Sequence, residues 1–199
     1  MDFRDVLSRR RMVRAYSDEP VPRETVERIC RTIRRAPSGG FSQGARLIVV
    51  SDRDTRKDLA RLAGEDEYPD PWISSAPVHV VVLTREEDYH ERYRQQDKLR
   101  DGEELSWPAP YWYVDAGAAF MLLLLAAIDE GLVAGTYGVL GEDVQPLKDL
   151  LGVPDDVHFV CVVTLGYPAA EDPDVASARS SRITQMRKPL DEVVRWERW

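Results

Sequence analysis

The first fifteen residues of the chain concentrate positive charge in a protein that is acidic overall. The formal net charge is −8, yet five arginines lie in this short stretch: Arg4, Arg9, Arg10, Arg11 and Arg14. A guanidinium group presents planar donors that match the oxygens of a phosphate or carboxylate two at a time. The cluster favours an anionic partner, which could be a small molecule; the alternative is a solvated helix end held by ion pairs. The net negative charge argues against general affinity for nucleic acid.

Two glycine-rich stretches offer backbone groups rather than side chains. Residues 36–44 (Ala-Pro-Ser-Gly-Gly-Phe-Ser-Gln-Gly) have the composition of a loop. Residues 133–138 (Val-Ala-Gly-Thr-Tyr-Gly) are also expected to be a loop, whose backbone can approach something flat because few side chains intervene. Alternative roles stay open within the first stretch. Ser38 could cap a helix or stabilise a turn, and Gln43 could form an ordinary loop hydrogen bond.

The cysteines and histidines form no reactive or metal-binding pattern. Cys30 and Cys161 belong to no CxxC motif, and His79, His90 and His158 are scattered along the chain. These spacings fit neither a zinc site nor a Ser-His pair. We therefore predict no metal site, no thiol-redox pair and no Ser-His pair. His79 lies in an apolar run, and we expect it to be a hydrogen-bonded histidine of the core or of a sheet end, and not a catalytic one.

The apolar stretch 116–128 is the element around which the rest of the chain is expected to pack. It contains no polar side chain, so a helix there has no solvent face and must be enclosed on all sides. The stretch is too short to cross a bilayer. Asp115 is expected to be its N-cap, and Gly131 is placed for a left-handed C-cap.

Hydrophobic periodicity predicts the remaining elements. Helices are expected at 2–10, 22–35, 52–63 and 142–151, and buried strands at 45–50, 77–83 and 158–165. The charged stretch 86–104 is expected to be a solvated helix or a mobile lid. The aromatic run 107–113 has two interpretations, plain packing or a surface that faces a substrate.

Length and composition indicate an ordinary globular protein. The chain has 199 residues, of which 43% are hydrophobic and 31% charged, so one domain over residues 1–199 is expected. Met1 leads into a charged amphipathic segment without an apolar signal region, and we expect a cytoplasmic protein.

Five short motifs resemble, in order and spacing, those of the FMN-dependent nitroreductase superfamily over essentially the whole chain. The family patterns are Arg-Arg-Ser-x-Arg-x-Phe followed by Pro-Val, Ala-Pro-Ser-x-x-Asn-x-Gln-Pro-Trp, an apolar helix ending in Gly-Leu-Gly, Leu-Gly-Tyr-Pro, and a basic pair before Pro-Leu. The matching residues are Arg10 to Tyr16 with Pro20-Val21, Ala36 to Arg46, Gly131 to Val133, Leu165 to Pro168, and Arg187 to Leu190.

The resemblance implies both a fold and a reaction. The fold would be α+β with three layers, a central mixed sheet flanked by helices, and the long apolar helix at the interface of a homodimer. The cofactor would be FMN, reduced by NADH or NADPH. It would carry out the chemistry itself, so no side chain is expected to act as a general acid or base. A small organic acceptor such as a nitroaromatic or quinone would then take two electrons in a ping-pong cycle. Neither nucleic acid nor a membrane is expected as a partner.

The same resemblance implies the cofactor contacts. Arg10, Arg14 and Arg187 would meet the phosphate and ribityl end, and backbone amides of 133–135 would face the ring, where preorganised donors stabilise negative charge. The full set is Arg10, Arg11, Met12, Arg14, Pro37, Ser38, Gly39, Gln43, Val133, Ala134, Gly135 and Arg187. Taken alone, Arg187 is surface charge near a terminus.

The chain departs from the family patterns at several positions. Met12 replaces Ser, Phe41 replaces Asn, Gly44-Ala45 replace Pro-Trp, and Val133 replaces Gly. The changes at Phe41, Gly44-Ala45 and Val133 bear on the electron acceptor more than on FMN, whereas Met12 can contribute only its backbone or packing. Two alternatives remain open: a specialised flavin-dependent relative, which fragments reduced flavin or dehydrogenates a bound product, and a non-enzymatic flavin or deazaflavin carrier.

Overall fold

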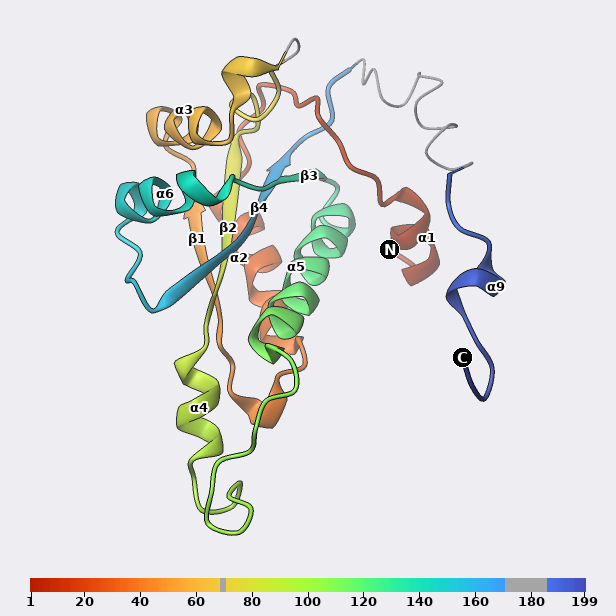
Figure 1. The fold of residues 1–199 in the computed structure, drawn as a ribbon. Helices are drawn as coiled ribbons and strands as arrows, with labels where there is room; N and C mark the ends of the chain where they lie inside the picture. Colours follow the sequence, from red (N-terminus) through yellow and green to blue (C-terminus); the bar gives the residue numbers. More distant parts are fainter. Residues whose placement is uncertain (69–70, 171–185) are drawn as a thin grey trace.

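The computed structural model describes residues 1–68, 71–170 and 186–199 (Figure 1). A four-stranded sheet of order β1-β2-β4-β3 lies at its centre. The strands are β1 (Ala45–Val50), β2 (Val78–Arg85), β3 (Val133–Tyr137) and β4 (Val157–Gly166). The strands expected at 45–50, 77–83 and 158–165 are therefore confirmed to within two residues at each end.

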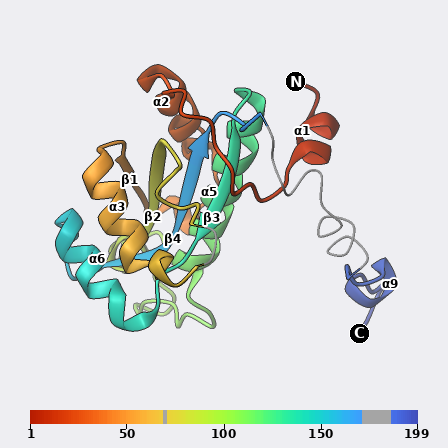
Figure 2. The same cartoon turned by 90° about the horizontal axis from the view of Figure 1, so that it is seen from above.

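Helices cover both faces of the sheet, which gives the expected three layers (Figure 2). On one face, α3 (Arg53–Leu62) and α6 (Val144–Leu151) bury Leu59 and Leu147 against Val81 and Val162. On the other face lie α2 (Arg23–Arg31) and α5 (Tyr111–Asp129). Their apolar side chains meet those of β2 and β4 in a second buried cluster, which includes Ile29, Leu123, Val80 and Val163. The α+β class is confirmed.

The expectation of a mixed sheet is wrong for the part of the chain that the structure describes. All three pairings, β1 with β2, β2 with β4 and β3 with β4, are antiparallel. The registers show that β2 and β3 run in the same direction, because each is antiparallel to β4. The helix α5 forms a crossover between these two parallel strands, but β4 inserts between them, so they never pair.

The long helix α5 starts earlier than the sequence suggests. It begins at Tyr111, directly after Pro110, so Asp115 lies inside the helix and is not its N-cap. The aromatic run supplies the first turn because the side chain of Trp112 is buried. The predicted C-cap is confirmed: Gly131 has φ 79°, and the amide of Leu132 donates to the carbonyl of Ala127 at 2.8 Å.

The helix α5 is long and apolar enough, by length and composition alone, to cross a bilayer. In the fold its inner face, including Leu123, Leu124 and Ala127, packs against the sheet. Its other side is not enclosed within this chain, since Val114 is 58% and Met121 is 42% exposed. The expectation of a helix enclosed on all sides is therefore not met by one copy.

Two further predictions need correction. Residues 133–137 form β3 and not a loop, because β4 on one side and Val13 on the other supply partners that local sequence cannot reveal. Residues 86–104 are neither fully solvated nor a detached lid. They begin with α4 (Glu87–Tyr93), which is attached to the fold by the fully buried side chain of Tyr89.

The remaining elements in the part of the chain that the structure describes are short. They are α1 (Phe3–Arg9), α9 (Leu190–Val193) and the 3₁₀ turns Thr32–Arg35, Gly39–Phe41, Glu65–Glu67 and Gly141–Asp143. The first turn continues α2 and so accounts for the helix expected up to residue 35. In Figure 1, α1 lies near the end of α5, whereas the C-terminal segment with α9 stands apart from the sheet.

Candidate functional site

Residues 10–14, which we call the arginine segment, cross β3 in close backbone contact. The amide of Val13 donates to the carbonyl of Ala134 at 3.0 Å. A Cβ added to Gly135 would lie only 2.4 Å from the carbonyl oxygen of Val13, so no other residue fits at position 135. The fold thus brings Met12 to Arg14 onto Val133 to Gly135, two expected site segments that are far apart in the sequence.

The arginines of this segment face outward from the crossing. Arg10 and Met12 are half-buried, whereas Arg11 and Arg14 are exposed. The guanidinium carbon of Arg14 lies 5.5 Å from the centroid of the Trp72 ring, a cation–π distance that orients the side chain along the surface. Arg187 is exposed and precedes α9 in the separate C-terminal segment (Figure 1). Seen from above, the C-terminal segment with α9 lies away from α1 and the segment that follows it (Figure 2).

The loop at residues 36–44 has an unusual backbone. Gly40, Phe41 and Gln43 all have positive φ, at 58°, 64° and 56°. That region is unfavourable for a bulky side chain, yet Phe41 occupies it with 74% of its surface exposed. The hydroxyl of Ser38 accepts a hydrogen bond from the amide of Gln43 at 2.7 Å. Ser38 therefore stabilises a turn, one of the roles left open by the sequence.

This loop borders a hollow of about 250 Å³. Its lining includes three expected site residues, Pro37, Ser38 and Gln43, and their loop neighbour Phe41. Tyr89 of α4 and Asp115 of α5 also line it. The lining combines apolar rings with a carboxylate and an amide. It could receive part of a flat, mostly apolar ligand with polar edges.

Asp115 and Tyr89 hold this loop, and sequence reasoning missed both. The carboxylate of Asp115 accepts from the amide of Gly39 and from the hydroxyl of Tyr89, each at 2.8 Å. Burial, and then the neighbouring Asp115, raise the pKa of the Tyr89 hydroxyl, so it stays a proton donor. The ring of Tyr89 also leaves no room for a side chain at Gly44. Asp115 was detectable as the lone carboxylate beside an apolar helix, but it was interpreted as a cap.

The helix α4 supports the loop from behind. The guanidinium of Arg92 donates to the carbonyl of Gly40 at 2.9 Å. His90 lies between two carboxylates, with Nδ1 at 2.5 Å from Glu104 and Nε2 at 3.3 Å from Glu86. The hydrogen bond to Glu104, reinforced by Glu86, raises the pKa of His90. The loop is thus held by side chains of α4 and α5.

His79 has the opposite environment. It is fully buried; its Nε2 lies 2.9 Å from the carbonyl of Ile73, and its Nδ1 lies 3.1 Å from the hydroxyl of Tyr137 on β3. Burial lowers the pKa of His79 to about 4. The ring is therefore neutral at pH 7, donating to Ile73 and accepting from Tyr137. His79 is the hydrogen-bonded core histidine expected from the sequence.

The two groups of expected site residues lie at opposite ends of α5. We call residues 10–14 with 133–135 the arginine half, and residues 36–44 with Tyr89 and Asp115 the loop half. At 1.5 Å per residue, Asp115 is about 21 Å along the helix axis from Asp129, the last residue of α5. In Figure 1 the loop lies beside the start of α5 and β3 lies beyond its end. One chain therefore does not assemble the full set.

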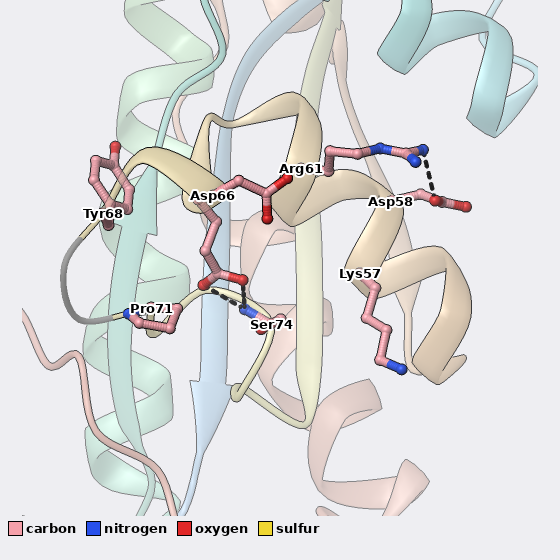
Figure 3. A pocket seen from close by; sticks show the side chains of 8 residues that line it. Lys57, Asp58, Arg61, Asp66, Tyr68, Pro71 and Ser74 are labelled. Carbon is pink, nitrogen blue, oxygen red and sulfur yellow. Dashed lines mark hydrogen bonds and ion pairs between the residues drawn. The ribbon is translucent and has the colours of Figure 1, made fainter.

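A larger hollow, of about 550 Å³, is lined by α3 and by residues 65–68 and 71–74 (Figure 3). Its labelled side chains carry charges of both signs, and Arg61 pairs with Asp58 at 2.8 Å. None of the expected site residues lines it. Among the residues that the structure describes, no group of three or more His, Cys, Asp or Glu side chains could hold a metal ion.

The chain is similar to known proteins over most of its length. A model of the nitroreductase family matches residues 7–67 and 64–167. An FMN reductase [NAD(P)H] of Bacillus subtilis is 30% identical over 183 residues, which cover 90% of this chain and 69% of that protein. An iodotyrosine deiodinase of Nematostella vectensis is 27% identical over 220 residues, covering 97% and 74%. The NADPH:FMN oxidoreductase of Vibrio harveyi, solved with NAD⁺, shares the fold with a TM-score of 0.73 at 22% identity, covering 98% and 76%.

Proposed function

The chain belongs to the nitroreductase family, and on that premise we propose that it passes electrons from NAD(P)H through FMN to a small organic acceptor. When bound, FMN would supply the redox chemistry: it would accept hydride from the nicotinamide and pass two electrons to the acceptor that takes the place of the nicotinamide. The protein binds the cofactor, orients the substrates against it and shields the site from water. The observation that carries the proposal is the crossing at Gly135, where the pairing of Val13 with Ala134 sets the arginines beside the backbone of β3.

The residues of the arginine half fit a flavin phosphate and ring edge. Arg10 and Arg14 offer fork-shaped donors for phosphate oxygens. In an antiparallel pair, neighbouring residues direct their N–H and C=O groups to opposite sides. Since the carbonyl of Ala134 binds Val13, Val133 and Gly135 face β4, and Ala134 directs its N–H to the outer edge. Of the three expected amides, we assign the ring contact to Ala134.

We further propose a homodimer in which each site takes the arginine half of one subunit and the loop half of the other. The separation of the halves along α5 supports this, because a single flavin cannot reach both within one chain. An exposed apolar surface supports it too: Val114 and Met121 on α5 are 58% and 42% exposed, and Phe3 and Leu7 on α1 are 64% and 48% exposed. Surfaces of this kind are usually covered by a partner subunit.

The function is tested by the absorption spectrum of the purified protein. We expect a yellow protein with an oxidised-flavin spectrum that NADH or NADPH bleaches in the absence of oxygen. Turnover with a quinone or nitroaromatic should follow when the acceptor is added. A colourless protein that takes up no added FMN contradicts the proposal, and flavin binding without bleaching favours a carrier.

The shared site is tested by mixing two defective subunits. Arg14→Ala damages the arginine half and Asp115→Ala damages the loop half. In a mixed dimer, one site would carry both changes and the other neither, so co-expression should restore flavin binding that each variant alone lacks. If both halves of a site came from one chain, mixing would restore nothing. Light scattering should show a dimer at micromolar concentration. We expect the C-terminal segment to pack across the neighbouring subunit in this dimer.

One alternative has its own observation. The similarity to an iodotyrosine deiodinase, together with Phe41 in place of the usual Asn, favours a specialised relative that acts on a particular aromatic compound. Comparing NADPH-driven turnover of a quinone with that of an iodinated tyrosine separates a general reductase from the specialised relative. Faster turnover of the iodinated tyrosine would favour the specialised relative. The expected cytoplasmic location stays a prediction, to be checked by cell fractionation.

A further inference from the structure

Tyr16, the last residue of the arginine motif, places its hydroxyl where the N-terminal segment crosses the sheet. The hydroxyl donates to the carbonyl oxygen of Val13 at 3.0 Å and lies 2.7 Å from the hydroxyl oxygen of Thr164 on β4. All three residues are buried, with exposures of 9%, 1% and 0% for Tyr16, Val13 and Thr164. A Cβ added to Gly135 would come within 2.8 Å of both hydroxyl oxygens. Three segments therefore meet at this point with no space between them.

The direction of these hydrogen bonds follows from counting protons. A phenol hydroxyl carries one proton and can donate only once. Because that proton goes to Val13, the short contact with Thr164 is one in which Thr164 donates and Tyr16 accepts. The result is a relay that runs from Thr164 through Tyr16 to a main-chain carbonyl. Buried hydrogen bonds in series strengthen one another, and each is costly to leave unmade.

The relay ends on the peptide unit that leads into Arg14. The carbonyl of Val13 and the nitrogen of Arg14 belong to one planar group, so holding the oxygen fixes the plane from which Arg14 departs. The amide of Val13 is held as well, by the carbonyl of Ala134 at 3.0 Å. With Val13 fixed against the sheet, its neighbours Met12 and Arg14 point to the outer side, as their greater exposure shows.

We propose that Tyr16 is a positioning residue for the phosphate-binding arginines. Its hydroxyl, held by Thr164, sets the register of residues 12–14 over β3 and hence the direction in which Arg14 meets an anionic ligand. The inference rests on the proposed function, because it takes the FMN phosphate as that ligand. The family pattern has Phe at this position, so the hydroxyl is a contribution of this chain.

The test compares Tyr16→Phe with a matched control, Tyr137→Phe. Each change removes one buried hydroxyl and keeps the ring, but the hydroxyl of Tyr137 bonds His79 and does not contact the arginine segment. FMN and riboflavin affinities are measured by fluorescence quenching, beside thermal unfolding of the apo-protein. Tyr16→Phe should weaken FMN about threefold to tenfold and riboflavin much less, since riboflavin has no phosphate. Tyr137→Phe should leave the ratio of the two affinities unchanged.

A double-mutant cycle tests the relay itself. Thr164→Val should weaken FMN in the same direction, and Tyr16→Phe with Thr164→Val should lose less than the sum, because both changes break one relay. Additive losses would overturn the relay. Equal weakening of FMN and riboflavin by Tyr16→Phe, or no weakening, would assign the hydroxyl to stability alone. A wild-type protein that binds neither flavin would overturn the proposed function, and this inference with it.

Discussion

The arginine half and the loop half of the site, at the two ends of α5, are held by different interactions. In the arginine half, main chain meets main chain: Val13 pairs with Ala134, and Gly135 leaves no room for a side chain. In the loop half, the side chains of Asp115 and Arg92 bind the backbone of the loop. A backbone junction tolerates changes in outward side chains, whereas a junction made by side chains depends on each of them.

The departures from the family patterns illustrate this difference. Met12 and Val133 replace smaller residues in the arginine half, and the backbone pairing there is intact. In the loop half, Phe41 stands where Asn is usual and adopts a positive φ that Asn tolerates better. The loop therefore stores strain that Asp115, Tyr89 and Arg92 must balance.

The largest expected effect is a difference in pH response. Burial lowers the pKa of His79, which supports β3, from 6.5 to about 4. The unfolded chain therefore takes up a proton first as the pH falls. The contribution of His79 to the free energy of unfolding is complete above pH 6.5. It falls by about 3 kcal/mol as the pH drops from 6.5 to 4.

His90, behind the loop half, should respond in the opposite direction. Glu104 raises its pKa, so its contribution is complete below the unfolded pKa of 6.5 and is lost as the pH rises through the folded value. Amide hydrogen exchange between pH 7.5 and 4.5 should show β3 losing protection on acidification while residues 38–44 do not. The same trend in both halves would remove the distinction. His90→Gln should abolish the response of the loop half alone.

The second effect concerns the arginine half. If Arg10, Arg14 and Arg187 meet one phosphate, each contact is worth roughly 1.5–3 kcal/mol, and changing any one to Ala should weaken FMN about tenfold to a hundredfold. Arg14→Lys should recover only part of the FMN affinity that Arg14→Ala loses, because an ammonium group cannot bind phosphate in a fork. Riboflavin titrations are the control. A loss of riboflavin affinity as large as that of FMN would mean that these arginines hold the fold.

The third effect concerns the loop half. Asp115→Ala removes the acceptor of the Gly39 amide and the Tyr89 hydroxyl, and should lower the free energy of unfolding by about 2 kcal/mol. FMN and riboflavin should weaken together, because the loop meets the ring and not the phosphate. Asp129→Ala is the matched control on the same helix. Asp129 pairs with the N-terminal amine at 52% side-chain exposure, and its loss should change stability by less than about 0.5 kcal/mol. Equal effects of the two changes would contradict the assigned role.

The smallest effect is a gain. Phe41→Asn places a residue that tolerates positive φ where Phe is strained, and should raise the free energy of unfolding by about 1 kcal/mol. Phe41→Leu keeps the unfavourable φ and should give no such gain. Urea unfolding of both variants provides the measurement. A stabilised Leu variant would show that exposure of the ring, and not the backbone, is what costs stability.

Much of the fold could be predicted because its signals are local. The apolar runs at 45–50 and 77–83 specify strands, and Gly131 specifies a helix end, without reference to distant residues. The misinterpretation of β3 has a physical cause. Gly135 resembles a loop glycine locally, but it is a glycine because Val13 crosses it, and that contact joins residues far apart in the chain.

The candidate site was predictable only in part, for the same reason. Sequence patterns marked the arginine motif and the loop, but not the residues that hold the loop. Asp115 was interpreted as a cap because the aromatic first turn of α5 packs through Trp112, a tertiary contact. Tyr89 was missed because the residues around it are almost all charged or polar, which is typical of a solvated helix. The separation of the halves along α5 has no local signature at all.

The place of β4 in the sheet has a consequence for synthesis. This strand is the last of the four in the chain, yet it lies between β2 and β3 and pairs with both. Until Gly166 has left the ribosome, β2 has an open edge and β3 has no strand to pair with. At about 5–20 residues per second, the nascent chain spends most of its synthesis without a closed sheet. The chain is therefore expected to fold late, over long sequence separations and slowly, and to expose its apolar strands to chaperones before the arginine segment has β3 to cross.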